Sequence, residues 1–155
     1  MDPAGDLDEL ERSAGTEALL KATCRALTST TDADACMISR VLGDLLISIA
    51  EWAVSGESLQ LGHGYLLPDF PVTAEVLERI EPRLVTLLEA DADPDEARVL
   101  MEMGFDSLLM LPLVVGDVSW ALVEVYVSGR QFGETDVERA LPIVQRAGEI
   151  LTERL

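Results

Sequence analysis

Four segments of the chain carry apolar residues at spacings of three and four, which is the pattern of an amphipathic helix. In the first, Leu7, Leu10 and Ala14 begin an apolar stripe that continues to Leu27. In the last, Thr135 and Glu138 form a capping box, which marks a helix start. The predicted helices cover residues 6–29, 72–80, 94–103 and 135–155.

Two pairs of apolar runs, each pair joined by a Gly-Asp turn, predict two β-hairpins. The turns are Gly43-Asp44 and Gly116-Asp117. Both faces of the second hairpin are apolar, so we expect it in the middle of a sheet. The predicted strands are Cys36–Val41, Leu45–Trp52, Arg83–Leu88, Ser107–Val115 and Val118–Val127. Because hairpins imply antiparallel pairing and the helices must cover the sheet, the pattern predicts an α+β fold with an antiparallel sheet.

The charge of the chain excludes two classes of partner. Eleven Lys and Arg residues stand against 29 Asp and Glu residues, for a net charge of −18 at pH 7. Binding to nucleic acid or to an anionic membrane needs clustered cations, which this sequence lacks. The acidic N-terminus is unlike a signal peptide, and the apolar runs are too short to cross a bilayer. We therefore expect a cytoplasmic protein that binds neither nucleic acid nor membrane.

The sequence is poor in residues that perform catalysis or bind metals. His63 is the only histidine, so neither a catalytic triad nor a multi-histidine metal site can form. Cys24 and Cys36 lack the spacing of a zinc site, and each lies in an apolar segment like a small core residue. We expect no catalytic residue, no metal and no cofactor.

Several motifs resemble those of the GAF domain family. They are Leu111-Pro112-Leu113, Leu122-Val123-Glu124, the segment from Phe132 to Asp136, and Pro68-Asp69-Phe70-Pro71. The order of elements is also similar to this family, and the similarity spans roughly residues 15–154. The resemblance implies an α+β fold of the GAF/PAS-like type, an antiparallel sheet of five or six strands with helices on both faces. It also implies residues 1–14 as an N-terminal helical extension and residues 15–155 as a single domain.

The resemblance also bears on ligands. Asp69-Phe70-Pro71 is similar to the Asp-Ile-Pro segment that lines the bilin pocket of phytochrome GAF domains. Covalent bilin attachment there needs a cysteine near the chromophore, and Cys24 and Cys36 lie elsewhere. GAF domains that bind cyclic nucleotides carry an Asn-Lys motif, whereas this chain has no asparagine. A few GAF sensors bind haem through a histidine near this loop, but His63 between two glycines favours a solvated loop.

In the sheet order that the resemblance implies, the first predicted strand lies between the second and the last, so that Arg40, Glu51 and Glu124 are neighbours. Counting from both turns puts these three on the same face as Trp120. Two interpretations stay open: Arg40 binds an anionic ligand group, or an internal Arg–Glu pair closes the cavity and ties the strands together. The candidate pocket residues are Arg40, Glu51, His63, Tyr65, Asp69, Phe70, Trp120 and Glu124.

The resemblance implies a sensory or regulatory domain without catalysis of its own, which binds a small molecule or relays a signal to an output protein. The alternative is a ligand-free dimerisation or scaffold domain whose pocket has collapsed around Trp52, Tyr65, Trp120 and Arg40. An empty cavity above a few hundred cubic ångströms among these residues favours the sensor, and a filled one favours the scaffold.

The last predicted helix indicates a homodimer. Beside its main apolar stripe it carries a second one, formed by Ala140, Ile143, Ala147 and Ile150. A helix packed on a sheet buries a single stripe, so we expect the second to meet another copy of the chain. Two copies joined through their terminal helices form a four-helix bundle.

Overall fold

The computed structural model describes residues 3–59, 62–87 and 93–155. Its helices are α1 (Pro3–Arg12), α2 (Thr16–Thr30), α3 (Pro71–Arg79), α4 (Pro94–Met103) and α5 (Glu134–Arg154), with a 3-10 turn at Leu67–Asp69. Its strands are β1 (Ala35–Leu42), β2 (Leu45–Ala53), β3 (Gly64–Leu66), β4 (Arg83–Thr86), β5 (Ser107–Val115) and β6 (Val118–Val127). They form one sheet in the order β3-β2-β1-β6-β5-β4, and each recorded neighbour pair is antiparallel. The end of the strand predicted over Arg83–Leu88, residue 88, lies outside the described residues.

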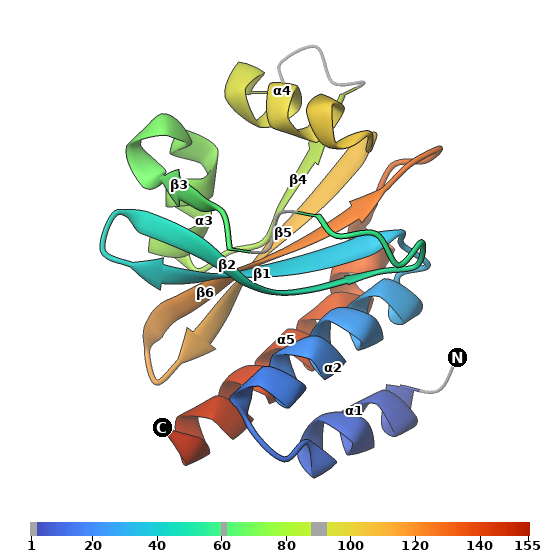
Figure 1. The fold of residues 1–155 in the computed structure, drawn as a ribbon, viewed down its shortest axis with the longest axis vertical. Helices are drawn as coiled ribbons and strands as arrows, with labels where there is room; N and C mark the ends of the chain where they lie inside the picture. Colours follow the sequence, from blue (N-terminus) through green and yellow to red (C-terminus); the bar gives the residue numbers. More distant parts are fainter. Residues whose placement is uncertain (1–2, 60–61, 88–92) are drawn as a thin grey trace.

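The sheet separates two layers (Figure 1). α2 and α5 cover one face, here called the terminal-helix face, and α1 packs on the outer side of these two helices. The core on this face includes Leu27 and Val123. α3, α4 and the 3-10 turn cover the other, here called the cavity face, whose core includes Met37 and Leu100. The predicted α+β fold, an antiparallel sheet with helices on both faces, is confirmed, with six strands and with the second hairpin mid-sheet.

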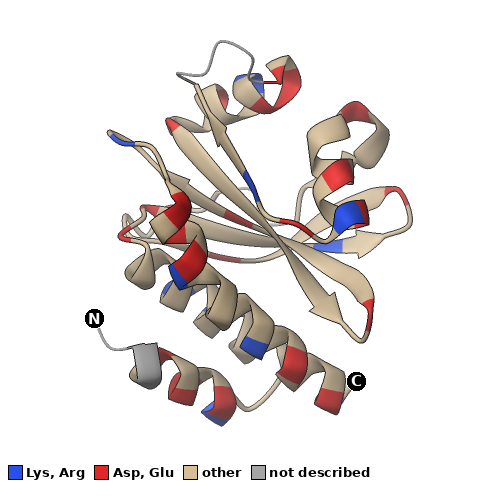
Figure 2. Cartoon of the chain, turned by 180° about the vertical axis from the view of Figure 1, so that it is seen from behind, with Lys and Arg blue, Asp and Glu red and all other residues tan. Residues whose placement is uncertain are grey.

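Most of the charged residues lie on the outside of this arrangement. Figure 2 shows Asp and Glu spread over helices and turns on both sides of the sheet, with few Lys and Arg among them. In the described part of the chain, no helix has the length and hydrophobicity needed to span a membrane.

The single helix predicted over residues 6–29 is wrong, because the chain breaks between α1 and α2. The Ser13 hydroxyl donates to the Glu9 carbonyl oxygen (3.0 Å) at the end of α1, and Gly15 is extended before α2. α1 then folds back so that Leu10 is completely buried in the terminal-helix core. A straight helix would carry Leu10 away from that core, so its burial favours the break.

The second apolar stripe of α5 is buried within the chain itself. Its members, Ala140, Ile143, Ala147 and Ile150, are at most 4% exposed. Both α1 and α2 pack against α5, and the stripe belongs to the same core as buried residues of these two helices. The surface on which the predicted homodimer rested is therefore occupied by the chain's own N-terminal helices, and the homodimer stays a prediction.

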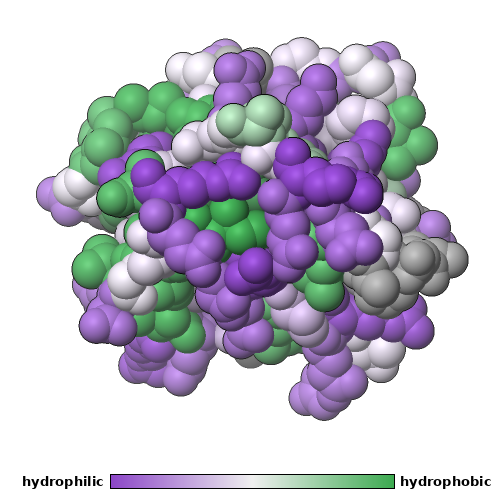
Figure 3. All heavy atoms as spheres, turned by 90° about the horizontal axis from the view of Figure 1, so that it is seen from below, coloured by the Kyte–Doolittle hydropathy of each residue, from purple (hydrophilic) through white to green (hydrophobic). Residues whose placement is uncertain are grey.

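Ion pairs hold α1 in this position. Arg25 of α2 contacts Glu9, and Arg146 of α5 contacts Glu11 at 3.0 Å. Seen from below, the end of the molecule that carries α1 and the C-terminus is mostly hydrophilic, with hydrophobic side chains in separate patches (Figure 3). With α1 folded back, an apolar helix face is covered, and charged side chains form the surface instead.

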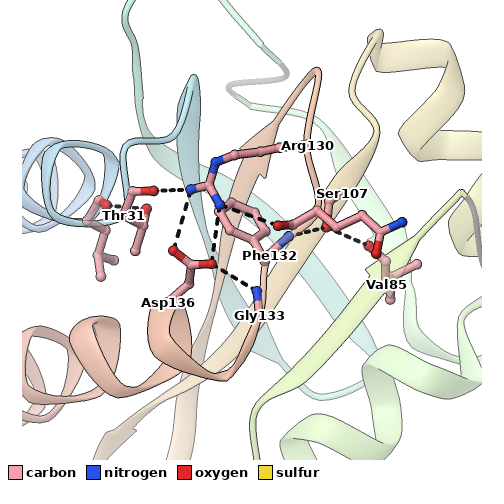
Figure 4. Close-up of polar contacts among 9 residues, drawn as sticks. Thr31, Val85, Ser107, Arg130, Phe132, Gly133 and Asp136 are labelled. Carbon is pink, nitrogen blue, oxygen red and sulfur yellow. Dashed lines mark hydrogen bonds and ion pairs between the residues drawn. The ribbon is translucent and has the colours of Figure 1, made fainter.

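α5 begins without the predicted capping box of Thr135 and Glu138. The helix starts one residue earlier, after Gly133, whose N–H donates to Asp136 Oδ2 at 2.9 Å (Figure 4). Asp136 thus satisfies a free N–H at the helix start, and its negative charge suits the positive end of the helix dipole.

The same corner ties three parts of the fold together (Figure 4). The Arg130 guanidinium contacts Asp136 at 3.3 Å and donates to the Thr31 carbonyl oxygen at the end of α2. The Phe132 N–H donates to the Ser107 hydroxyl oxygen at 3.1 Å, at the start of β5. The motif from Phe132 to Asp136 therefore positions α5 against the sheet and α2.

A bulge in the first hairpin changes the predicted faces. The turn has the predicted pairing, but the register slips between Ile38 and Ser39. Beyond the slip, Glu51 lies opposite Met37 on the cavity face. A slip of one residue moves every following side chain to the opposite face, so the prediction that Arg40 and Glu51 share a face is wrong.

A second bulge has the same effect in the other hairpin. The turn pairing is again as predicted, but Leu113 lies opposite Ala121 and Val114 opposite Ser119, which leaves Trp120 as the extra residue. Glu124 and its neighbours at 122 and 126 therefore face the cavity, whereas leucines 109, 111 and 113, predicted to accompany them, face the terminal helices.

Gly148 lets α5 lie directly against β5. A Cβ built at this position would lie closer to the Val114 carbonyl oxygen than van der Waals contact allows, and this oxygen is backbone and cannot rotate away. Alanine normally favours a helix over glycine by about 1 kcal/mol, but overpacking costs about 1–3 kcal/mol. We therefore expect Gly148→Ala to lower the free energy of unfolding in urea titrations. Gly15→Ala, where a Cβ meets nothing within 4 Å, is the matched control and should change little.

Candidate functional site

A cavity lies on the cavity face of the sheet, beneath α3 and α4. Its volume is about 30 Å³. The described residues that line it are Leu46, Tyr65, Phe70, Thr73, Glu96, Val99, Leu122, Glu124 and Tyr126. Tyr65, Phe70 and Glu124 were predicted as pocket residues, and the structure brings these three together.

The sheet supplies the floor of the cavity. Glu124 on β6 lies between Met37 of β1 and Met110 of β5, and Tyr126 follows two residues later on the same face. β3, a short edge strand, brings Tyr65 opposite Leu46 of β2. Alternation along β6 thus places a carboxyl and a phenol side by side in an otherwise apolar layer.

Two helix starts supply the roof. Pro71 occupies the first turn of α3, where a proline fits, and the preceding 3-10 turn presents Phe70. Asp93 caps α4 by accepting the Glu96 N–H at 3.2 Å, and this start turns the Glu96 side chain inward. The Thr73 hydroxyl of α3 donates to Glu96 Oε1, which links the two helices over the cavity.

The two carboxyls of the cavity are hard to ionise. Burial, and then the nearby charge of Glu96, raise the pKa of Glu124 to about 8. Burial also raises the pKa of Glu96, and the hydrogen bond from Thr73 opposes this rise. Two carboxyls that share a poorly solvated site cannot both ionise easily, so one proton stays there at neutral pH.

The two tyrosines stay protonated beside them. Burial and the charge of Glu124 raise the pKa of Tyr65 to about 12, and the same two causes raise the pKa of Tyr126 well above its ordinary value. A hydrogen bond from Tyr126 to Glu124 adds to this rise in the pKa of the phenol. The described lining contains no Lys, Arg or His. The cavity can therefore bind groups that donate hydrogen bonds, and it can hold or release a proton.

The structure corrects the positions of Arg40 and Trp120. Arg40 lies opposite Ala121 on the terminal-helix face, and its guanidinium stacks 4.3 Å from the centre of the Trp120 ring. Its Nη1 donates to the Trp120 carbonyl oxygen at 2.8 Å. Both residues pack toward the opposite side of the sheet from Glu124, because each hairpin contains a bulge. The predicted anion anchor and the predicted Arg–Glu pair are therefore both wrong.

The set of residues proposed to collapse into the pocket is likewise divided between the two faces. Trp52 packs in the terminal-helix layer, where Arg25 lies 5.8 Å from its ring, whereas Tyr65 lines the cavity. A collapse around both tryptophans, Tyr65 and Arg40 is therefore excluded by their separation on two sides of the sheet.

Three predicted residues lie near the cavity without lining it. Glu51 accepts a hydrogen bond from the Ser58 hydroxyl at 2.9 Å and so fixes the loop after β2. The His63 side chain is exposed, and its carbonyl oxygen accepts from the Ser48 N–H at 3.0 Å. Asp69 is exposed at the end of the 3-10 turn. Their roles in binding stay predictions.

Sequence reasoning missed Thr73, Glu96 and Tyr126. Glu96 belongs to an acidic run that suggests a solvated helix start, but it is only 5% exposed. Its spacing of four from Leu100 and seven from Met103 places it on the apolar side of α4, and this spacing was the available signal.

The cysteines lie on the other side of the sheet. Cys24 and Cys36 are both completely buried in the terminal-helix core. Burial and the neighbouring Cys24 thiol raise the pKa of Cys36 well above its usual value, so it is a poor nucleophile. Neither belongs to the described lining of the cavity, and no cluster of three metal-binding side chains occurs in the described residues.

The chain is similar to a known family and to known structures. The profile of the GAF domain family matches residues 15–151. The fold is similar to the phycocyanobilin-bound GAF domain of a cyanobacterial phytochrome, with a TM-score of 0.84 and 18% identity over 99% of this chain and 95% of that one. The phycoerythrobilin-bound GAF domain of a cyanobacterial phytochrome gives a TM-score of 0.82 and 20% identity over 98% and 95%.

A longer structure gives the same fold. The chromophore-binding domain of an unusual bacteriophytochrome from R. palustris matches with a TM-score of 0.82 and 15% identity, over 98% of this chain and 61% of that one. No curated protein matches the sequence. At these identities the structural similarity concerns the fold.

Proposed function

This chain belongs to the GAF domain family, and on that premise we propose that it is a sensory or regulatory domain that binds a small molecule in the cavity and relays the bound state to an output protein, without catalysis of its own. One observation carries this proposal: two carboxyls and two phenols converge on a cavity beneath α3 and α4. Polar groups converging in a buried, largely apolar cavity are typical of a ligand site.

The ligand is smaller than a bilin. The similar phytochrome domains hold phycocyanobilin or phycoerythrobilin, but the cavity here measures about 30 Å³. Both cysteines of this chain lie across the sheet from it. Size and the position of the thiols therefore favour a compact ligand without a covalent link.

The strand β6 offers a route for the relay. Leu122 and Glu124 line the cavity, whereas Ala121 and Val123, which alternate with them, pack beneath the terminal helices. A shift of β6 on ligand binding would therefore change the packing of α5, because close-packed layers transmit displacements.

Three further parts of the proposal concern organisation. Residues 1–14 form an extension to a domain of residues 15–155, and the protein acts in the cytoplasm. A homodimer through the terminal helices forms when α1 leaves the apolar stripe of α5. The acidic surface and the buried stripe support the idea that α1 keeps the copies apart at rest.

A cavity-filling variant tests the ligand site. Val99→Phe places a larger side chain into the cavity wall, so we expect a small molecule that accompanies the wild-type protein from its own host to be lost. Native mass spectrometry of both proteins measures this. Val54→Phe, at a position 71% exposed, is the control and should retain the bound mass.

The small volume favours one alternative, a ligand-free dimerisation or scaffold domain. A cavity of about 30 Å³ lies far below the size of typical ligand pockets, about 300–1,000 Å³. A wild-type protein that carries no bound mass, and that no small molecule stabilises against heat, would support the scaffold instead of the sensor.

A further inference from the structure

The lining of the cavity contains a surplus of acidic groups. Glu96 and Glu124 supply two carboxyls, and Thr73, Tyr65 and Tyr126 add hydroxyls, while no Lys, Arg or His belongs to the described lining. The Thr73 hydroxyl already donates to Glu96. A carboxylate in a poorly solvated site is costly without a cationic or strongly donating partner.

A second observation comes from the floor of the same face. Ser39 and Ser48 lie opposite each other on β1 and β2, and both are at most 2% exposed. Within the described residues, neither hydroxyl has a hydrogen-bond partner. Ser39 also lies opposite Leu122, which lines the cavity. The two serines lie beside the cavity and not in its described lining, and their hydroxyls are polar groups of this layer that the described residues do not satisfy.

We propose that the cavity binds a small protonated amine, whose N–H groups donate to Glu124 and Glu96. This inference rests on the proposed function, because it names the chemical class of the ligand for that site. A cation is favoured over an anion, since an anion would meet two carboxyls and no positive side chain in the described lining.

The volume limits the size of the amine. A buried water needs about 10–15 Å³ of cavity volume, so a cavity of about 30 Å³ holds roughly two water-sized groups. Methylammonium, with one carbon and one nitrogen, matches this size. Its methyl group fits the apolar wall of Leu46, Val99 and Leu122, and its three N–H donors suit the carboxyl oxygens.

Binding exchanges a proton for the amine. The Glu124 carboxyl is protonated at neutral pH, because its pKa is raised to about 8. When the ammonium enters, the carboxyl O–H proton leaves to solvent and the carboxylate accepts an N–H from the ligand. The net charge of the site is the same before and after, since one proton leaves and one cation enters.

The surroundings of Glu124 determine the pH dependence. Glu96 faces it from α4, Tyr65 from β3, Tyr126 from its own strand, and Glu51 lies two strands away in the same cross-strand row. These four groups are neutral or negative and never positive, so they favour the retention of a bound cation. As the pH rises toward 8, the apparent affinity for the amine should therefore increase by about tenfold per pH unit.

Titration calorimetry with methylammonium chloride on the full chain tests this inference. We expect saturable binding and the release of one proton at neutral pH, measured in two buffers of different ionisation enthalpy. Glu124→Gln keeps the size but cannot become anionic, so it should bind at least about tenfold more weakly. Glu102→Gln, an exposed position on α4, is the matched control and should bind like the wild type.

Three ligands separate the possible outcomes. Sodium chloride controls for ionic strength, tetramethylammonium chloride lacks N–H donors and exceeds the cavity, and sodium acetate tests an anion. Equal heats from methylammonium and tetramethylammonium, or no response to methylammonium, would overturn the inference. If acetate or another compound binds and Val99→Phe abolishes that binding, the amine is wrong while the proposed sensory site stands. If no compound binds the wild type, both are wrong.

Discussion

Glu124→Gln should make the protein more stable than the wild type at alkaline pH. In the unfolded chain the carboxyl has its ordinary pKa of 4.5, whereas the fold raises it to about 8. The folded state therefore retains a proton that the unfolded state has lost. Stability is full below pH 4.5, falls by about 1.4 kcal/mol per pH unit above it, and levels off near pH 8, a loss of a few kcal/mol.

Glutamine cannot ionise, so it removes this contribution. Urea denaturation between about pH 5 and pH 9 should show a difference in unfolding free energy between variant and wild type that grows with pH and then becomes constant. Near pH 5 the two proteins should be similar. Glu102→Gln, whose carboxyl is exposed on α4, should run parallel to the wild type throughout. Parallel curves for Glu124→Gln would mean that Glu124 ionises as freely in the fold as in the unfolded chain.

Leu10→Asp should release α1 and expose the second stripe of α5. Leu10 is completely buried in the terminal-helix core, and losing a buried leucine side chain alone costs about 2–5 kcal/mol. An aspartate there adds the cost of an unpaired buried charge. The total destabilisation is larger than the stabilisation that the exposed ion pairs Arg25–Glu9 and Arg146–Glu11 contribute. We expect α1 to detach and two chains to associate through Ile143 and its stripe.

Sedimentation equilibrium measures the result. The variant should double in mass, and more completely at high salt, because salt screens the repulsion between two chains of charge −18. The wild type should stay a monomer. Leu155→Asp, at a position 68% exposed, controls for the added charge. The contrary outcome is a variant that stays a monomer although circular dichroism shows the loss of helix content expected for α1 alone. In that case α1 is not what keeps the chains apart.

The amino-acid pattern was sufficient for most of the elements and for the pairing next to both hairpin turns, although it missed β3 and the break between α1 and α2. Both Gly-Asp turns and the pairs next to them, Leu42 with Leu45 and Val115 with Val118, are as predicted. These features are local, since two residues of turn chemistry and a run of alternating apolar residues determine them. The motifs were sufficient for the family as well, which the profile match over residues 15–151 confirms.

The site depended on contacts that no local pattern contains. One extra residue in each hairpin, Trp120 in the second, reverses every face assignment that follows, and nothing in an apolar run marks where the slip occurs. The side of the sheet on which Arg40 and Glu124 fall therefore came from the tertiary structure.

Burial at the helices was decided in the same way. α1 reaches its place only because α2 and α5, far apart in sequence, offer Leu10 a common apolar surface. Glu96 becomes a cavity residue only because α3 brings Thr73 against it. The sequence by itself determined most of the segments that are helix or strand, whereas packing between distant segments determined which side chains meet, because burial is a property of the assembled layers and not of any single element.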